Sequence, residues 1–597
     1  MSPAFRVDIL RHEPYAALSF CDRKNLTEEV RMRPKRWLVR QVDPVQVIHM
    51  AQSLSISSLT ATVLLGRGIG EAAQARGWLF PSSKQLHDPF ELPDMERAVD
   101  RLHQAFVKRE RLCVYGDYDV DGVSASSLAW LWARDFTTDV DIYIPHRQRE
   151  GYGLNESALR TLASRGVSLL VTADCGTTAH REVALAKHLG IDVIVVDHHR
   201  IPGSCPNVYA FVNPYRCDSR YPFCGLCSAG LIYKLVEAYL TKYGHRSYPV
   251  ENFLDLVALA TIADVVPLQD ENRMLVREGL KLLSEGRRCG IRALKRCVGI
   301  EGACTASLVG FRLAPVLNAA GRLAHAHLGV QLLTTPSERE AERLAYELEH
   351  FNRRRREIEQ EMYEQADHLV SQQAEMPAIV VGSRQWHMGV VGIVASRLVE
   401  SYHRPAIVIA FDEQGVGRGS ARSVPGYDIC EALTQCAEFL EGFGGHAAAA
   451  GLTIREARVA AFAEKFMEIV QMRCGAPHVD PVLEIDAYVN LADLQPPLLR
   501  ELERLHPFGL GNPEPIFAVE GLTVLERKVV GDGHLKLVVR HPRSVPFESI
   551  GFRMGQWAQW VDVSTPRIDL AFIPELTHWR GFDRIQLRIK DLRIPAG

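Results

Sequence analysis

Three aspartates occupy alternate positions early in the chain, directly after a short apolar run at residues 112–115. They are Asp117, Asp119 and Asp121. Carboxylates this close repel one another, and either full solvation or bound cations relieve the repulsion; oxygen ligands suit hard cations such as Mg²⁺ or Mn²⁺. The spacing also opens the calcium loop of an EF-hand, but Leu128 stands where that loop needs a glutamate. The motif alone leaves two interpretations, a metal site and a solvated acidic turn.

Further acids and histidines follow other predicted strands and helices. They are Asp174, Asp197, His198, His199 and Asp264. Taken singly, they have ordinary interpretations: a helix-end charge for Asp264 and a hydrogen-bonded loop pair for the two histidines. Taken together, they favour a binuclear metal site, because two cations about 3.5 to 4 Å apart need ligands from several directions.

The segments around these residues alternate between strand and helix patterns. Apolar runs predict strands at residues 112–115, 140–145, 168–173 and 191–196. Helical periodicity begins at Asp94 and recurs at residues 123–136 and 157–164. This alternation is typical of βαβ units and a mainly parallel sheet. Ligands bind such sheets beyond the carboxyl ends of the strands, which is where the acids are predicted to lie.

Length and composition are typical of a globular protein with several domains. The chain has 597 residues, of which 47% are hydrophobic and 24% charged, which predicts about three to five domains. No apolar run approaches the roughly 18 residues that span a membrane. Because residues 1–10 also lack a segment of signal-peptide length, we expect a cytoplasmic protein without a membrane partner. The net charge of -3 predicts that any nucleic acid is held by local basic patches.

The 13 cysteines form an odd number in a chain without a recognisable secretion signal, so we expect reduced thiols. One cluster contains Cys205, Cys217, Cys224 and Cys227. A Cys-x-x-Cys pair with two further thiols is compatible with structural zinc, but the second pair lacks the spacing of known zinc sites. Free thiols are therefore the favoured interpretation.

The order and spacing of these motifs resemble those of a known superfamily. The loop 117–122, the isolated Asp174, the triplet 197–199 and residues 261–264 are similar to the four motifs of the DHH phosphoesterases. Within that superfamily the chain resembles the RecJ exonuclease family from about Lys35 to its end. Supporting segments are residues 144–145, 150–154, 212–214 and 317–322.

The resemblance implies roles for individual residues around a site for two Mg²⁺ or Mn²⁺ ions. The implied metal ligands are Asp119, Asp121, Asp174, His198 and Asp264, with Asp117 as a further ligand. His199 is implied to lie near the scissile phosphate and to belong to the catalytic set. Asn318 and Arg322 are implied substrate contacts.

Two positions depart from the family's pattern. The superfamily often has a histidine where this chain has Tyr115, which predicts that one metal is bound differently or with help from Asp117. The family commonly has an arginine where this chain has Val316. That departure predicts a missing phosphate contact unless Arg312 or Arg322 supplies the charge.

A long helix is predicted after the catalytic part. Thr335 is the expected cap, Pro336 the first helical residue, and helical spacing continues to Leu369. About 35 residues would reach about 50 Å. The arginines at 353–356 are either a DNA-facing surface or solvated helix charge.

Residues 375–475 predict a second, smaller α/β unit, with strands at 378–381 and 406–410 and a helix at 390–398. Three segments that bear glycine or histidine, residues 386–387, 417–423 and 444–447, are expected to form turns that approach phosphate. Together they resemble a DHHA1 domain that grips the nucleic-acid backbone. The implied substrate contacts are His387, Arg418, Ser420, Arg422, Gly444, Gly445 and His446.

The last stretch contains several short strands and little helical periodicity. Strands are predicted at residues 516–524, 535–539, 568–572 and 584–589. This pattern predicts a small β-barrel. In position it is similar to the OB-fold of the RecJ family, a fold commonly used to bind single strands.

The expected fold class is α/β with several domains. An N-terminal segment (1–85) precedes a parallel-sheet DHH catalytic domain (86–335). A connecting helix (336–374), a DHHA1 domain (375–475) and an OB-fold β-barrel (476–597) follow.

The resemblance implies a metal-dependent 5′-to-3′ exonuclease that degrades single-stranded DNA to mononucleotides in DNA repair and recombination. It also implies a single-strand-binding protein and a repair helicase as partners. Two other classes remain open. A phosphodiesterase of short oligonucleotides or cyclic dinucleotides would not need the barrel, and a non-catalytic single-strand-binding scaffold would not need the complete ligand set.

Overall fold

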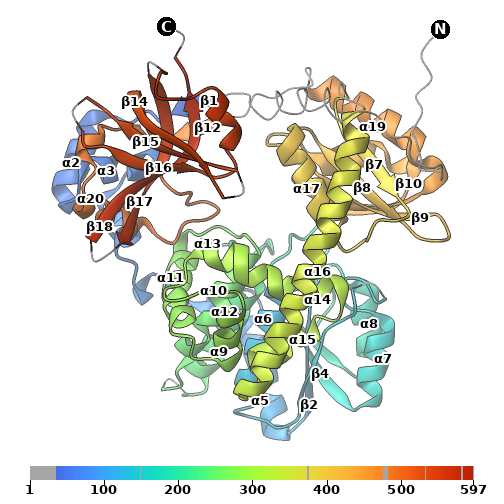
Figure 1. Cartoon of the computed structure of the whole chain (residues 1–597). Helices are drawn as coiled ribbons and strands as arrows, with labels where there is room; N and C mark the ends of the chain where they lie inside the picture. The colour runs from blue at the N-terminus through green and yellow to red at the C-terminus, as the bar shows by residue number, and fades with distance from the viewer. Residues whose placement is uncertain are drawn as a thin grey trace. The chain divides into compact units, whose positions relative to one another are not determined.

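The computed structural model describes residues 35–595 except 148, 246, 373–375, 475–481, 532, 543, 566 and 580–581 (Figure 1). The chain divides into two compact units. The larger unit contains residues 39–352 and 485–597, and the smaller contains residues 353–484 together with the described residues before 39.

A five-stranded sheet forms the centre of the larger unit, with strand order β3-β2-β4-β5-β6. Its strands are β2 (Arg111–Gly116), β3 (Val140–Tyr143), β4 (Val167–Ala173), β5 (Asp192–Val196) and β6 (Ala210–Val212). All neighbouring strands are parallel, which confirms the prediction from the alternating pattern.

Helices cover both faces of this sheet (Figure 1). One face packs against α5 (Met95–Lys108), α6 (Val120–Ala133) and α9 (Ser228–Lys242), and the other against α7 (Glu156–Ser164) and α8 (His180–His188). Strand β2 shows why both faces are covered. Leu112 and Val114 belong to the first hydrophobic core, and Cys113 and Tyr115 belong to the second. Both alternating faces of the strand are therefore apolar, as in other buried parallel sheets.

Further helices complete this part of the larger unit. They are α10 (Leu254–Ala263), α11 (Asp270–Glu285), α12 (Cys289–Cys297), α13 (Ala306–Leu308), the π-helical turn η4 (Val309–Leu313), α14 (Ala314–Leu323) and α15 (His327–Thr334). Helix α10 is apolar on all sides, and Leu256, Val257 and Leu259 are completely buried. A helix of this kind belongs in a core, and here it brings Asp264 to the end of a rigid element.

The C-terminal strands form a closed barrel. They are β14 (Phe517–Val530), β15 (His534–Arg540), β16 (Phe547–Gly551), β17 (Ile568–Trp579) and β18 (Phe582–Arg593). Strand β14 pairs with both β15 and β17, which closes the sheet and removes its free edges. The predicted barrel is confirmed, although β16 was not predicted from the sequence.

Helices from the start of the chain share the core of this barrel. They are α2 (Pro44–Leu54), α3 (Ser58–Gly66) and α4 (Ala72–Leu79). Val63 and Leu64 lie in one hydrophobic cluster with Leu522 and Leu570. The guanidinium of buried Arg273 on α11 donates to the carbonyl oxygens of Trp78, Leu505 and Arg504 at 3.0, 2.8 and 2.8 Å. These hydrogen bonds connect the N-terminal helices and the segment before the barrel to the catalytic helices.

The smaller unit contains a mixed five-stranded sheet of order β10-β11-β9-β8-β7. Its strands are β7 (Ile379–Ser383), β8 (Ala406–Phe411), β9 (Val416–Arg422), β10 (Leu440–His446) and β11 (Ala449–Arg455), and its helices are α17 (Val391–Tyr402), α18 (Ile429–Gln435) and α19 (Val459–Cys474). The glycine-rich segments of β9 and β10 were predicted to be turns, and that prediction is wrong. A Cβ at Gly417 would lie 2.6 Å from the Phe411 ring, so glycine here permits close strand packing.

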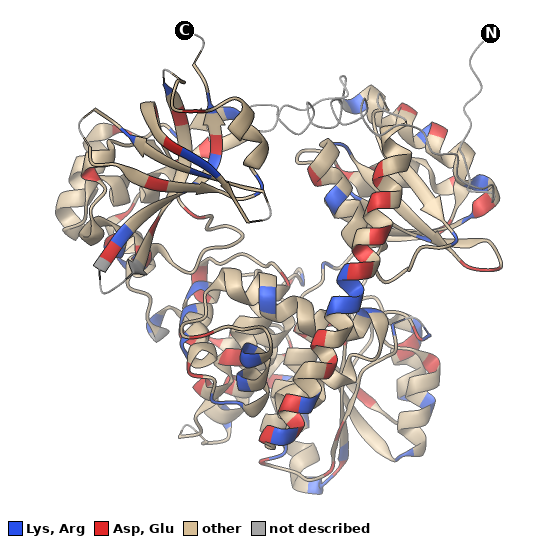
Figure 2. Ribbon diagram, viewed as in Figure 1, with Lys and Arg blue, Asp and Glu red and all other residues tan. Residues whose placement is uncertain are grey.

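Helix α16 (Glu338–Ser371) connects the two units. It begins two residues later than predicted, and Ser337 accepts the backbone N–H of Glu340. Charges of both signs alternate along it (Figure 2). Arg354 pairs with Glu357 at 3.0 Å and Arg355 with Glu359 at 2.8 Å. For these two arginines, the interpretation as helix charge paired along the helix is therefore favoured.

Within the described part of the chain, no single helix has the length and apolar character needed to cross a membrane. The bent pair α2 and α3 meets that test by length and composition alone.

Candidate metal centre

The strands β2, β4 and β5 end in one register. Beyond their last residues the backbone ladder continues, because the N–H of Asp117 donates to Ala173 O and the N–H of Asp174 donates to Val196 O, each at 3.2 Å. Asp197 occupies the equivalent position after β5. The register therefore places three of the predicted acids in one row along the rim of the sheet.

The next two acids lie at the start of α6. Asp119 is the N-cap, and its Oδ1 accepts the backbone N–H groups of Asp121 and Gly122 at 2.9 and 3.1 Å. Gly122 is needed for close packing, since a Cβ there would lie 2.5 Å from the carbonyl oxygen of Asp117. The cap and this close contact fix the direction of the acidic loop.

The N-terminus of α9 holds two carboxylates, Asp121 in the first turn of α6 and Asp174 after β4. The N–H groups of Ser228 and Ala229 donate to Asp121 at 2.7 and 2.8 Å. The Ser228 hydroxyl donates to Asp174 Oδ1 at 3.0 Å. Helix N-termini stabilise negative charge, so α9 both orients these carboxylates and favours their ionised form. Ser228 was missed in the sequence, where an isolated serine before a helix carries no specific signal.

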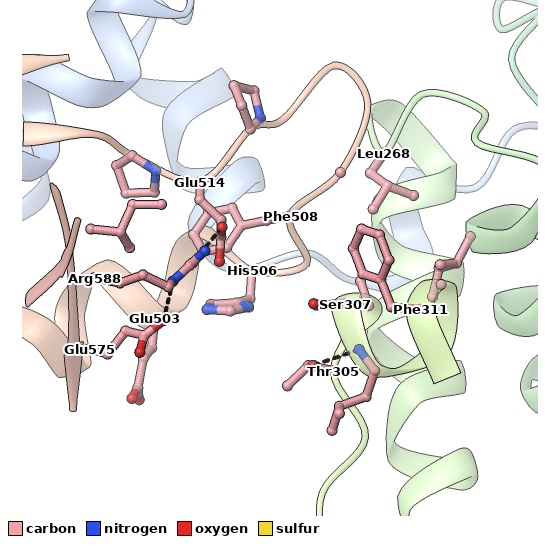
Figure 3. Close-up of a pocket in the computed structure, with 18 of the residues that line it drawn as sticks. Leu268, Thr305, Ser307, Phe311, Glu503, His506, Phe508, Glu514, Glu575 and Arg588 are labelled. Carbon is pink, nitrogen blue, oxygen red and sulfur yellow. Dashed lines mark hydrogen bonds and ion pairs between the residues drawn. The ribbon is translucent and has the colours of Figure 1, made fainter. Parts of the chain in front are cut away.

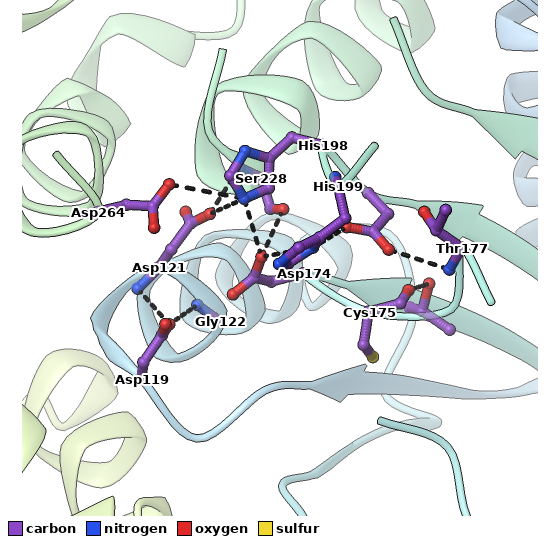
Figure 4. A network of polar contacts seen from close by, with 12 residues as sticks. Asp119, Asp121, Gly122, Asp174, Cys175, Thr177, His198, His199, Ser228 and Asp264 are labelled. Atoms are coloured by element: carbon purple, nitrogen blue, oxygen red, sulfur yellow. Dashed lines mark hydrogen bonds and ion pairs between the residues drawn. The ribbon is translucent and has the colours of Figure 1, made fainter. Parts of the chain in front are cut away.

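His198 lies at the centre of the polar network in Figure 4. Its Nε2 atom is 3.3 Å from Asp174 Oδ1, 3.5 Å from Asp264 Oδ2 and 3.8 Å from Asp121 Oδ2. The structure thus brings together side chains that follow β4, β5 and α10 and one from the first turn of α6.

His199 is held by a different carboxylate. Its Nδ1 is 2.7 Å from Asp197 Oδ1, and Asp197 Oδ2 accepts the N–H of Thr177 at 3.0 Å. Burial lowers the pKa of His199, but the hydrogen bond and charge of Asp197 outweigh burial and raise this pKa to about 9. His199 is therefore positively charged at neutral pH, which suits it to contact a phosphate.

The carboxylates are crowded and shielded from water. Burial raises the pKa values of Asp117, Asp121 and Asp174, and neighbouring carboxylates raise them further. Burial, followed by the charges of Asp121 and Asp119, raises the pKa of Asp264 to about 9. Asp117 Oδ1 and Asp264 Oδ2 are buried and accept no hydrogen bond from the described residues. A bound cation would offset both the repulsion and the missing partners.

Three sets of donor atoms have the spacing of metal ligands, with all atoms of a set within 4.8 Å of one another. The sets are Asp117, Asp119 and Asp174; Asp121, His198 and Asp264; and Asp174, His198 and His199. Asp174 and His198 each belong to two sets. The Asp174 carboxylate can bridge two neighbouring cations, whereas the imidazole nitrogen of His198 binds one. Carboxylate oxygens with an imidazole fit Mg²⁺ or Mn²⁺.

A hollow of about 350 Å³ adjoins these donors. Asn318 and Arg322 of α14 line it, and so do Tyr118, Arg147 and Tyr152, which were not among the predicted substrate contacts. The guanidinium of Arg147 lies 4.7 Å from the centre of the Tyr118 ring. Two arginines beside the metal donors suit a phosphate. The signal for Arg147 was its position between the family-like segments 144–145 and 150–154.

The two departures from the family pattern have structural explanations. Tyr115 points into the core on the side of α7 and α8, where its hydroxyl donates to Gly153 O at 2.9 Å and accepts from Asn155 at 3.0 Å. Val316 is completely buried, and Arg322 supplies positive charge to the hollow.

The cysteine cluster does not form a metal site in the part of the chain that the structure describes. No donor set found there includes a cysteine. Cys205 and Cys217 are exposed, while Cys224 donates to Pro214 O at 3.5 Å and buried Cys227 contacts Thr261 Oγ1 at 3.4 Å. These cysteines are free thiols.

The remaining predicted contacts lie in the smaller unit. Along β9, Arg418, Ser420 and Arg422 alternate with the small residues that face the core. Across β11, the register aligns Ser420 with Gly444 and Arg422 with His446. The Arg422 guanidinium donates to Ser420 Oγ at 2.7 Å.

Two other residues of this group have local structural roles. A Cβ at Gly445 would lie 2.4 Å from Ala449 O, so this position requires glycine. His387 follows β7 in the loop before α17, and its Nδ1 accepts the N–H of Gly389 at 3.1 Å. The sheet thus brings together Ser420, Arg422, Gly444 and His446 within one unit.

Three family models match the chain. The DHH family N-terminal domain matches residues 111–261, the DHHA1 domain matches residues 375–472 and the RecJ OB domain matches residues 485–591. The matched segments contain the parallel sheet, the mixed sheet and the barrel, respectively.

Similar proteins span most of the chain. The single-stranded-DNA-specific exonuclease RecJ of Bacillus subtilis is 37% identical over 94% of this chain and 71% of that protein. The crystal structure of Thermus thermophilus RecJ with Mn²⁺ has a TM-score of 0.80 at 30% identity, covering 94% of this chain and 80% of that one. The corresponding structure with Mg²⁺ has a TM-score of 0.75 at 29% identity, covering 94% and 79%.

Proposed function

Because the chain belongs to the RecJ family of single-stranded-DNA-specific exonucleases, we propose that it hydrolyses single-stranded DNA with Mn²⁺ or Mg²⁺ as its cofactor. The observation that carries this proposal is the convergence of seven acids and histidines on three overlapping donor sets, with Asp174 and His198 each belonging to two of them. A phosphodiesterase needs such a cluster, whereas a scaffold that only binds strands does not.

The proposed metal ligands are Asp117, Asp119, Asp121, Asp174, His198 and Asp264. When bound, the cations supply an acidified water and neutralise charge on the phosphate. Asp174 and the α9 N-terminus hold the ligand array in place. Charged His199 and Arg322 would bind the non-bridging phosphate oxygens, with Asn318 and Arg147 beside them.

The polarity and products are proposed from family membership: cleavage from the 5′ end, release of mononucleotides, and a role in DNA repair and recombination. A single-strand-binding protein and a repair helicase are proposed partners. A cytoplasmic location is also proposed, supported by the free thiols of the described cysteines.

The smaller unit is proposed to bind the strand's backbone. Arg418, Ser420, Arg422 and His446 offer side-chain donors, and Gly444 and Gly445 leave the backbone accessible. His387 is proposed as a further contact. We propose the domain division 1–85, 86–335, 336–374, 375–475 and 476–597, of which residues 1–34 lie outside the described structure.

End-labelled DNA tests the proposal. A long single strand labelled at either end is incubated with Mn²⁺, Mg²⁺ or EDTA, beside duplex and dinucleotide controls. The 5′ label should appear at once as a mononucleotide, while the 3′ label should remain in shortening strands. Cleavage restricted to dinucleotides would instead indicate a small-substrate phosphodiesterase, and binding without cleavage would indicate a scaffold.

A further inference from the structure

A second hollow, of about 950 Å³, lies in the larger unit between the catalytic helices and the barrel (Figure 3). Thr305, Ser307 and Phe311 line its helical side, and Glu503 and Phe508 belong to the facing side. At its edge the two sides touch, because the N–H of Leu268 donates to Leu510 O at 2.7 Å. The volume is within the range of ligand-binding pockets.

The larger hollow lies next to the hollow at the metal centre. Ala263, which precedes the metal donor Asp264, lines both hollows. Two consecutive elements also connect the two hollows. The π-helical turn η4 carries Phe311, which lines the larger hollow, and helix α14 carries Asn318 and Arg322, which line the smaller one. A strand held at the metal centre therefore has this space directly beside it.

The charges in the larger hollow do not suit phosphate. Glu503, Glu514 and Glu575 line it against the single guanidinium of Arg588. Arg588 is already paired with Glu514 at 2.7 Å and Glu575 at 2.5 Å. The Glu503 carboxylate makes no hydrogen bond or ion pair with any described residue. The free acceptor and the excess negative charge favour a neutral ligand that carries hydrogen-bond donors.

Phe311 provides an unusual apolar surface in this hollow. Its side chain is 83% exposed, more than the other large hydrophobic side chains of the described structure. It lies in a π-helical turn, and such turns occur frequently at functional sites. An exposed aromatic ring beside a single-strand path is a platform on which an unpaired base can stack.

We propose that the larger hollow binds an unpaired base of the substrate strand, stacked on Phe311, with Glu503 accepting a hydrogen bond from an exocyclic amino group. This inference rests on the proposed exonuclease function. Glutamate accepts readily from the amino group of cytosine. Thymine lacks an exocyclic amino group. Its one ring N–H lies between two carbonyl oxygens, which the Glu503 carboxylate would repel. The hollow would therefore give the enzyme a preference for cytosine over thymine.

Strand binding in EDTA tests the base site without cleavage. Fluorescence anisotropy would compare oligo-dC, oligo-dT and an abasic strand of equal length. We expect Phe311→Ala to weaken oligo-dC binding by about tenfold, with Phe311→Tyr close to the unchanged protein and the abasic strand unaffected. Because Phe311 is exposed, the alanine variant should fold normally, which circular dichroism checks.

Glu503→Gln tests the hydrogen bond separately. The unchanged protein should bind oligo-dC about three- to tenfold more tightly than oligo-dT, and the glutamine variant should lose most of that preference.

Equal weakening of abasic and oligo-dC binding by Phe311→Ala, or no weakening at all, would overturn the base site. If the unchanged protein still degrades oligo-dT with Mn²⁺, such a result leaves the exonuclease function standing; if it degrades no strand, the proposed function itself fails.

Discussion

The hydroxyl of Ser228 donates a hydrogen bond of 3.0 Å to Asp174, the carboxylate shared by two donor sets. The backbone N–H of the same serine donates to Asp121 at 2.7 Å. One residue at the start of α9 thus fixes ligands from two separate elements. This arrangement explains how the two carboxylates keep one orientation despite their mutual repulsion.

Ser228→Ala should weaken metal binding without unfolding the protein. The substitution removes the hydroxyl but keeps the backbone N–H that holds Asp121. Loss of such an outer hydrogen bond typically costs about 10- to 100-fold in metal affinity, and we expect the lower end of that range. Titration of Mn²⁺ followed by electron paramagnetic resonance measures it. Ser228→Thr, which keeps a hydroxyl, is the matched control, and equal affinities for all three proteins would refute the positioning role.

Asp264→Asn should abolish cleavage and preserve strand binding. Asp121 is a poorer choice, because it is 1% exposed and accepts two backbone N–H groups. Asp264 Oδ2 accepts no hydrogen bond from the described residues, so the amide replaces the carboxylate with little disturbance. We expect cleavage to fall by at least about a hundredfold. Exposed Asp218→Asn is the control, and near-normal activity of Asp264→Asn with saturating Mn²⁺ would exclude Asp264 as a ligand.

The metal-free protein should lose stability as the pH rises. The pKa of Asp264 is raised to about 9 in the folded state, whereas an unfolded aspartate has a pKa of about 3.9. The folded protein therefore binds more protons between these values, and the stability from protonated Asp264 is complete below about pH 4 and lost as the pH passes 9. Thermal unfolding in EDTA should show a lower Tm at pH 8 than at pH 5.5. Asp264→Asn should reduce this slope, and an unchanged slope would contradict the assigned pKa.

Removal of the barrel alone should expose a hydrophobic core. A chain ending near residue 475 would keep every proposed metal ligand but lose the barrel, and Val63 and Leu64 of α3 share the barrel's core. The truncated protein should aggregate in size-exclusion chromatography, and a version that also lacks residues 1–85 should stay monodisperse. If the chain that keeps residues 1–85 also stayed monodisperse, the N-terminal helices would fold without the barrel.

Local sequence patterns predicted the elements better than the contacts between them. Apolar runs predicted the parallel sheet, and the positions of Asp117 and Asp174 after strands predicted the rim. The strands β9 and β10 were missed because their glycines suggest turns, although Gly417 serves close packing. Ser228 was missed because one of its two hydrogen bonds to the carboxylates comes from its backbone N–H, which most residue types could supply. The shared core of α3 and the barrel joins segments more than 400 residues apart, which no local pattern reports.

The central claim is a pair of cations that share Asp174, and the electron paramagnetic resonance spectrum of the Mn²⁺-loaded protein tests it most directly. At saturation we expect two Mn²⁺ ions per chain with the exchange-coupled spectrum of ions about 3.5 to 4 Å apart. Asp174→Asn should remove the coupling. A spectrum of isolated, uncoupled Mn²⁺ in the saturated unchanged protein would contradict the account.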